Sequence, residues 1–393
     1  MNTSPTPSAF DGMPLDPVAA VTHADPYPYY AELRAGPPLA WNEALRLWVA
    51  SRAEVIESLL LAHGGALRVR PAAEPVPRAI AGSAAGEVFG HLVRMNDGTA
   101  HQAHRPALQR ALAGLDLGAV RTAALRVARD VPVQPVSDAL FSMPVRTVAH
   151  LLGFADEALP QVDRWMRDFV ACLSPLSTAE QLQDASAAAG ALMTRFEALA
   201  AGATPRDGTL LAAALAESQA SAPLSRALLA NLVGLLSQTC DATAGLLGNS
   251  LIAVMREPSL QEAAQTQGGL LAIVEETARH DPSVHNTRRF VAEPVTIAGT
   301  PLAAGDAVLL VLAAANRDPA LNPEPERFSL VRARRRMLGF GHGMHACPGQ
   351  ALACTLAAAG LEAVLHRTPD LAALRARGWH YRPSVAARIP VFH

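Results

Sequence analysis

The sequence predicts a mainly α-helical fold with a small β region. After residue 25, Ala, Leu and Arg dominate, and apolar residues recur at three- and four-residue spacing, which is the period of a helix with one buried face. Strand patterns are few and short, at 45–50, 289–297 and 307–312. Half of the 393 residues are hydrophobic, which is enough to bury a large core around an internal cavity.

The chain shows no internal repeat and no long low-complexity linker. Residues 1–20 are rich in Pro, Ser and Thr and lack a periodic apolar pattern, so we expect a flexible N-terminal arm. We expect residues 21–393 to form a single domain.

Composition excludes several classes of protein. The formal net charge is -2, so no excess of basic charge favours a nucleic-acid partner. The longest strongly apolar stretch, 307–315, is too short to cross a bilayer, and the N-terminus lacks a signal-peptide pattern. Four scattered cysteines do not make a secreted disulfide framework. We therefore expect a cytoplasmic protein that binds neither nucleic acid nor membrane.

One long buried helix is predicted over 224–257. No proline interrupts this stretch, Ser225 is a candidate N-cap, and Pro258 ends it. Its middle, 237–243, is polar and includes Asp241. Because burying an unpaired charge is costly, this patch must either be hydrogen-bonded as part of the structure or face a wet cavity.

A glycine-rich loop at 340–349 precedes a second predicted helix at 350–366. Cys347 lies just before this helix, where the helix dipole favours the thiolate form that binds metals. The three glycines of the loop let backbone N–H groups approach the sulfur. The pattern therefore indicates a thiolate metal ligand.

A zinc site is the alternative for this loop, because imidazole and thiolate are both zinc ligands. No Cys-x-x-Cys knuckle is present, which disfavours it. The candidate zinc ligands are His342, His345, Cys347 and Cys354.

Residues 340–349 resemble the heme-binding signature of cytochromes P450, Phe-Gly-x-Gly-x-His/Arg-x-Cys-x-Gly, at every defining position. The resemblance implies the cytochrome P450 fold, with heme b between the long central helix and the helix after the cysteine loop. It also implies that Cys347 ligates the iron, that Phe340 packs beneath the heme, and that His345 meets a propionate.

Further segments resemble the same family in the same order. In the segment 97–105, the resemblance makes His101 and Arg105 propionate partners. Arg289 falls at the place of another such partner, although Arg288 could take that role. The remaining matches are 25–34, 276–279, 316–319 and 325–328.

The pair Glu276 and Arg279 has an implied structural role. By resemblance it is a buried ion pair that meets Arg327 and fixes the region under the heme. Taken from the residues alone, the same spacing could also be a solvated ion pair on a helix surface.

The long helix departs from the family pattern. The family reads Ala/Gly-Gly-x-Asp/Glu-Thr-Thr/Ser there, whereas this chain has Ala242 in place of the first Thr. We expect Asp241 and Thr243 to be catalytic, in proton delivery. Thr239, ordered water or a substrate hydroxyl are other routes, and Thr243 could instead point away and only pack.

The implied substrate pocket is unusually polar. Gln238 lies one helical turn before Ala242, and His285 and Asn286 fall where the family lines its cavity. The two polar side chains of His285 and Asn286 predict a substrate with a hydrogen-bonding group near the iron.

The resemblance implies a heme-thiolate monooxygenase that inserts one oxygen atom from O2 into a small or medium organic substrate, in specialised metabolism or catabolism. Electrons would come from a separate ferredoxin or flavodoxin with its reductase. An arginine run at 332–336 would be its docking surface, or else simply a solvated face. Atypical chemistry, such as peroxide use, oxidative coupling or rearrangement, and a non-catalytic heme sensor are the alternatives.

Overall fold

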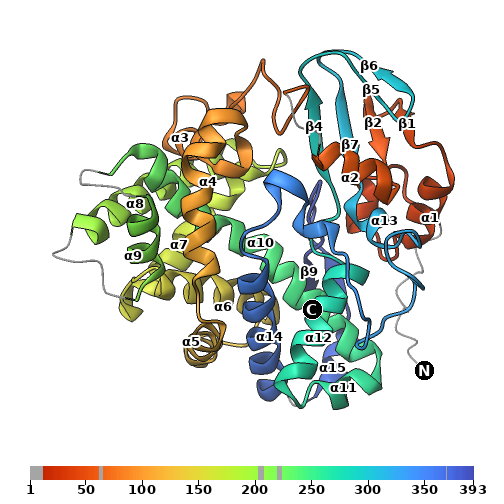
Figure 1. Ribbon diagram of the computed structural model, residues 1–393. Coiled ribbons are helices and arrows are strands. Elements are labelled where there is room, and N and C mark those ends of the chain that lie inside the picture. The colour runs from red at the N-terminus through yellow and green to blue at the C-terminus, as the bar shows by residue number, and fades with distance from the viewer. Residues whose placement is uncertain (1–11, 62–64, 202–207, 219–223, 369) are drawn as a thin grey trace.

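A long central helix, α10, separates a helical part of the molecule from a part that contains the main β-sheet (Figure 1). The computed structural model describes residues 12–61, 65–201, 208–218, 224–368 and 370–393. As predicted, this described part is mainly helical with little sheet.

Helix α10 spans Arg226–Arg256, close to the predicted 224–257. The Ser225 hydroxyl caps it by accepting a hydrogen bond from the Leu228 N–H, and Pro258 begins the next helix. Its 31 residues correspond to about 46 Å. It packs against α3, α6, α12 and α14, which makes it the axis of the core.

The helical part forms one large apolar core around α10. Its α5, α6, α7, α8 and α9 lie on the side of the molecule away from the main sheet (Figure 1). The helices of this core are α3 Ala84–His91, α4 Gly98–Ala113, α5 Leu117–Arg129, α6 Val136–Leu151, α7 Leu159–Val170, α8 Ala179–Ala201, α9 Leu210–Ser218, α11 Pro258–Ala263, α12 Gln267–His280, α14 Gln350–Arg367 and α15 Leu371–Arg377.

The main sheet has five strands in the order β1-β2-β7-β4-β3. The predicted strands at 45–50 and 307–312 correspond to β2 and β7, which pair in parallel. The predicted strand at 289–297 is instead two strands, β4 and β5, that lie in different sheets. The strands are β1 Leu39–Asn42, β2 Leu47–Ala50, β3 Leu67–Arg68, β4 Thr287–Val291, β5 Val295–Ile297, β6 Thr300–Leu302, β7 Ala307–Leu310, β8 Trp379–Tyr381 and β9 Pro390–Phe392.

Helices cover both faces of the main sheet. Helix α1, Tyr27–Ala35, contributes to the apolar cluster on one face, and α2, Ala53–Leu61, to the cluster on the other. Helix α13, Leu312–Asn316, follows β7 directly and contacts both α1 and α2.

Part of the expected N-terminal arm is packed. Residues 1–11 lie outside the described residues, but Pro14, Pro17 and Ala20 are buried. A 3₁₀ turn at Ala19–Thr22 follows, and the Arg388 guanidinium donates to backbone carbonyls within 21–24. These contacts hold the chain against the core before residue 21, earlier than composition suggested.

The C-terminal segment lies against α10 at two glycines. A Cβ built on Gly245 would lie 2.7 Å from the carbonyl oxygen of Arg388, and one on Gly248 would lie 2.4 Å from the Pro390 ring. Because these distances are shorter than van der Waals contact, only glycine permits this approach.

We predict that Gly245→Ala lowers the free energy of unfolding by about 1–3 kcal/mol, because its methyl group overpacks against the Arg388 backbone. The midpoint of chemical denaturation measures this. Gly268→Ala is the control, since a Cβ at that helical position meets no described atom within 4 Å. An unchanged midpoint for Gly245→Ala would contradict the close approach.

Candidate functional site

The cysteine loop is a tight turn that ends at α14. It consists of two 3₁₀ turns, Leu338–Phe340 and Gly343–His345, and the Cys347 N–H donates to the Phe340 carbonyl over 2.7 Å. Gly343 has φ 67°, and a Cβ there would lie 2.9 Å from the Leu60 carbonyl oxygen. Backbone geometry and the close contact with α2 therefore both require glycine here.

Solvent reaches the Cys347 thiol, although protein atoms surround much of it. Its side chain is reached by solvent, whereas Cys172, Cys240 and Cys354 are buried. Burial among protein atoms raises the pKa of the Cys347 thiol, and a hydrogen bond from the Gly349 backbone and the charge of Arg105 offset only part of this rise. An accessible thiol with these two stabilising groups is suited to ligate a metal as thiolate.

The zinc alternative is not supported. Cys354 lies buried on α14, and burial raises the pKa of its thiol to about 12. Within the described residues, no group of three or more His, Cys, Asp or Glu side chains is placed to hold a metal ion. Among the described residues, Cys347 is therefore not part of a zinc-type ligand set, and its role as a thiolate ligand stays a prediction.

Three cationic or imidazole groups near the cysteine loop carry unused hydrogen-bonding capacity. Arg105 on α4 donates to the Ala346 carbonyl, but its buried Nε has no partner among the described residues. The buried Nε2 of His101, also on α4, has none there either. Buried polar atoms without partners are costly, so these atoms point to an anionic ligand.

Arg289 on β4 is the third group of this kind, and its role toward a propionate stays a prediction. It is buried on β4, and among the described residues its side chain donates a hydrogen bond only to the neighbouring Arg288 carbonyl, over 2.9 Å. Arg288 is exposed, because successive residues of a strand point to opposite faces. The burial pattern thus favours Arg289 as the partner of a buried carboxylate.

His345 lies against His101, with ring centroids 4.6 Å apart, but its Nε2 pairs with Asp97 Oδ1 over 3.0 Å. Asp97 also accepts a 3.0 Å hydrogen bond from the Val69 N–H. Burial raises the pKa of Asp97, yet the His345 and Val69 hydrogen bonds outweigh it, so the pKa is lowered. Asp97 is a site residue to which the sequence reasoning gave no role.

One face of α10 is solvent-accessible in the middle of the otherwise buried helix. Leu235, Gln238, Thr239 and Ala242 form this face, at helical spacing. We call these four residues the accessible face of α10. Gln238 and Ala242 therefore lie on this face, and their place in a substrate pocket stays a prediction.

The hydroxyl groups on α10 are less available for proton delivery than predicted. The Thr239 hydroxyl donates to the Leu235 carbonyl over 2.8 Å. Thr243 is 1% exposed and lies about 100° around the helix from Ala242, off the accessible face. The structure does not bring Thr243 to the accessible face of α10.

Asp241 is held by an ion pair. Its Oδ2 accepts a 2.6 Å hydrogen bond from Arg382, which follows β8, and its Oδ1 is buried with no partner among the described residues. The structure therefore pairs Asp241 through Oδ2 and leaves its buried Oδ1 without a hydrogen bond among the described residues.

His285 and Asn286 lie in a different place from the one predicted. His285 is buried, with Nδ1 2.8 Å from the Tyr30 hydroxyl, and burial lowers its pKa to about 4. The Asn286 amide donates to the Val385 carbonyl over 2.9 Å. Both side chains join α1 and the C-terminal segment to the start of β4, and neither lies beside the accessible face of α10 in any described contact.

A buried carboxylate organises the chain that leads into the cysteine loop. Glu276 and Arg279 are fully buried and 2.7 Å apart, which confirms the predicted ion pair. Arg332 and Arg335 each approach Glu276 to 3.2 Å, and Ser329 N–H donates to it as well. One carboxylate thus binds three guanidinium groups.

This network corrects two predictions. Arg327 contributes its carbonyl to Arg279, while its side chain is exposed and pairs with Glu324. Arg332 and Arg335 are drawn inward by Glu276 and are not part of a free surface. Of the predicted docking run, only Arg334 and Arg336 are exposed, and Arg336 pairs with Glu57.

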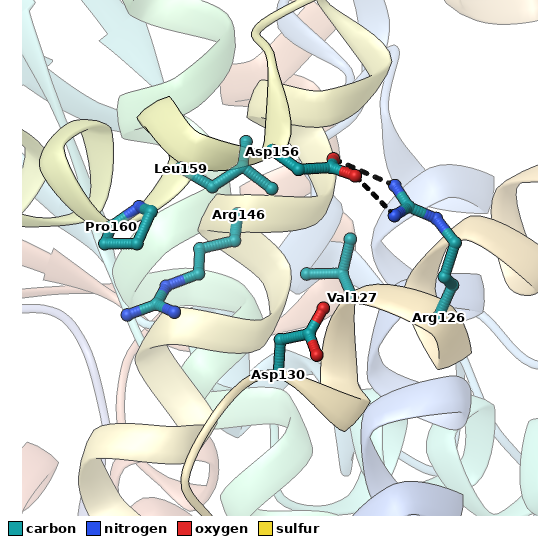
Figure 2. Close-up of a pocket in the computed structure, with 7 residues that line it drawn as sticks. All are labelled: Arg126, Val127, Asp130, Arg146, Asp156, Leu159 and Pro160. Carbon is teal, nitrogen blue, oxygen red and sulfur yellow. Dashed lines mark hydrogen bonds and ion pairs between the residues drawn. The ribbon is translucent and has the colours of Figure 1, made fainter.

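A separate small pocket lies between α5, α6 and α7 (Figure 2). Its volume is about 100 Å³, less than the ≈ 300 Å³ of the smallest ligand pockets. Arg126 donates to both oxygens of Asp156 there. None of the predicted site residues lines this pocket.

The fold and the site together define a heme-thiolate protein, because an accessible thiol faces partner-deficient Arg and His groups suited to heme carboxylates. A profile of the cytochrome P450 family matches residues 270–367. Cytochrome P450 144 of Mycobacterium tuberculosis is 31% identical over 314 residues, 76% of this chain and 71% of that protein.

The cytochrome P450 monooxygenase PikC of Streptomyces venezuelae is 30% identical over 378 residues, 89% of this chain and 85% of that protein. A solved structure of a myxobacterial cytochrome P450 in complex with myristic acid superposes with a TM-score of 0.74 at 26% identity, over 94% of this chain and 95% of that one. The chain belongs to the cytochrome P450 family, whose members are heme b monooxygenases.

No helix in the described part of the chain has the length and apolarity needed to cross a membrane.

We predict that Glu276→Gln lowers the free energy of unfolding by about 3–5 kcal/mol, because it leaves buried guanidinium groups without their counter-charge. Chemical denaturation of the heme-loaded protein measures the loss. Glu275→Gln is the matched control, since that side chain is 35% exposed and pairs with Arg335 alone. Equal losses for the two variants would contradict the central place of Glu276.

Proposed function

We propose that this protein inserts one oxygen atom from O2 into a small or medium organic substrate in specialised metabolism, with electrons delivered by a separate ferredoxin or flavodoxin and its reductase. The observation that carries the proposal is the accessible Cys347 thiol beside the partner-deficient Arg105. Relatives named monooxygenase or hydroxylase support oxygen insertion. The cytoplasmic location stays a prediction.

The residues fit heme b. Cys347 would ligate the iron as thiolate, with Phe340 beside it in the loop. His101, Arg105 and Arg289 would hold the two propionates, and His345 with Asp97 would border them. When bound, the heme supplies oxygen activation, which the electron-donating thiolate favours.

Proton supply would rely on water and on the unpartnered Oδ1 of Asp241. Ala242 has no hydroxyl, and the Thr239 hydroxyl is hydrogen-bonded within its own helix. A substrate hydroxyl is the other source of a proton at this point. Ala242 on the accessible face of α10 is also the observation that keeps peroxide use or rearrangement as the second candidate function.

Substitution of Cys347 by Ala should abolish the thiolate signature in the carbon monoxide difference spectrum and stop oxygen incorporation. Cys354→Ala, on the buried side of α14, should preserve both. The assay is mass spectrometry of products formed under labelled O2. Product without label would favour the second candidate function.

Arg334→Glu should slow reduction by an acidic ferredoxin several-fold at low salt, and the difference should shrink at high salt, because exposed charges steer association. Stopped-flow reduction of the heme measures this rate. Arg78→Glu reverses a charge that is also exposed, beside α3 and α8, and should leave the rate unchanged. Equal rates for Arg334→Glu and the unaltered protein would contradict a docking site at Arg334.

A further inference from the structure

Asp97 stands at the N-cap of α4 but does not cap that helix. Its backbone is extended, with φ -119° and ψ 172°, as an N-cap residue requires, yet its side chain accepts no hydrogen bond from the first turn. Aspartate is among the strongest capping residues. Asp116, at the N-cap of α5, shows the ordinary arrangement, because its carboxylate accepts from the Gly118 and Ala119 N–H groups. The Asp97 carboxylate is therefore directed to other partners.

The partners of Asp97 come from two elements that are distant in the sequence. Its Oδ2 accepts a 3.0 Å hydrogen bond from the Val69 N–H, just after β3, and its Oδ1 lies 3.0 Å from Nε2 of His345 in the cysteine loop. The side chains of His345 and Asp97 are 12% and 26% exposed, so the pair is largely sheltered from water. Val69 thus fixes the carboxylate to the sheet, and the carboxylate fixes the His345 ring.

The contact with Asp97 determines which edge of the His345 ring is left for a ligand. The ionised carboxylate can only accept, so Nε2 of His345 is the donor and Nδ1 is left for another partner. The ring lies against His101, with centroids 4.6 Å apart, and the buried Nε2 of His101 has no partner among the described residues. Asp97 therefore orients one imidazole beside another that has free hydrogen-bonding capacity.

Asp97 is also a counter-charge to the groups around it. Burial lowers the pKa of His101, and the charge of Asp97 opposes this shift. Burial likewise lowers the pKa of Arg289 on β4, and the charge of Asp97 opposes that shift as well. One carboxylate thus lies within electrostatic reach of imidazole and guanidinium groups from α4, β4 and the cysteine loop. Because these groups repel one another when charged, an acid among them helps to hold them together.

We propose that Asp97 is a positioning residue of the heme site, which holds the His345 imidazole in the orientation that meets a heme propionate. A ring that is already oriented binds a carboxylate with a smaller loss of conformational entropy than a freely rotating ring. The proposal shares with the proposed function the heme at Cys347, but it does not depend on the reaction catalysed there.

The test compares variants of the heme-loaded protein by their rate of heme loss to an excess of a heme-binding acceptor protein. Asp97→Asn should accelerate heme loss several-fold, because an amide has one acceptor oxygen and cannot accept from both His345 and Val69. Asp97→Glu keeps the charge and should recover part of the difference. The propionate bending band in the resonance Raman spectrum should shift in Asp97→Asn, since it reports hydrogen bonding to the propionates.

Asp116→Asn is the matched control, because it alters an N-cap carboxylate on the neighbouring helix and should change neither readout. In a His345→Gln background, Asp97→Asn should add little to the rate, since residues that act through one contact are not additive. If Asp97→Asn does not fold, Asp97→Glu carries the test, with a smaller shift of the same band expected.

Equal heme loss from Asp97→Asn and Asp116→Asn would overturn the proposal, as would an acceleration that is undiminished in the His345→Gln background. Slower heme loss from Asp97→Asn would also overturn it, because the carboxylate would then act on the propionates only by repulsion. Faster heme loss together with a shifted propionate band, in a protein that oxygenates nothing with a ferredoxin system, would leave the proposal standing and refute the proposed function.

Discussion

The buried carboxylate of Glu276 is the interaction on which the heme side of this protein depends. It binds Arg279 of its own helix and draws in Arg332 and Arg335 from the chain before the cysteine loop. Since an isolated buried charge is strongly unfavourable, these partners must be present together. The path of the chain from α12 to Cys347 is therefore defined by charge neutralisation as much as by apolar packing.

The features that sequence predicted well are those encoded locally. The limits of α10 follow from a capping Ser225 and from Pro258, and the cysteine loop follows from glycine positions that no other residue can occupy. The strands at 45–50 and 307–312 were visible as short apolar runs. The two-residue strand β3 was not, because its pairing with β4 comes from tertiary contact and not from a pattern of its own.

The errors concern polar residues whose role depends on distant partners. Arg332 and Arg335 resembled a solvated face because nothing local shows that Glu276 requires them. His285 resembled a pocket residue, but its imidazole nitrogen is hydrogen-bonded to Tyr30, which lies 255 positions away in the sequence. For Arg288 and Arg289, strand alternation decided which side chain is buried, and that could be known only once the strand limits were fixed.

The Asp241–Arg382 ion pair contrasts with Glu276 in exposure, since its two side chains are 33% and 42% accessible. Pairs this accessible contribute about 0–1 kcal/mol, comparable to thermal energy, whereas a buried cluster resists disruption. The charge cluster that holds the chain before Cys347 is therefore costly to break, whereas the ion pair between α10 and the residue after β8 contributes little to stability.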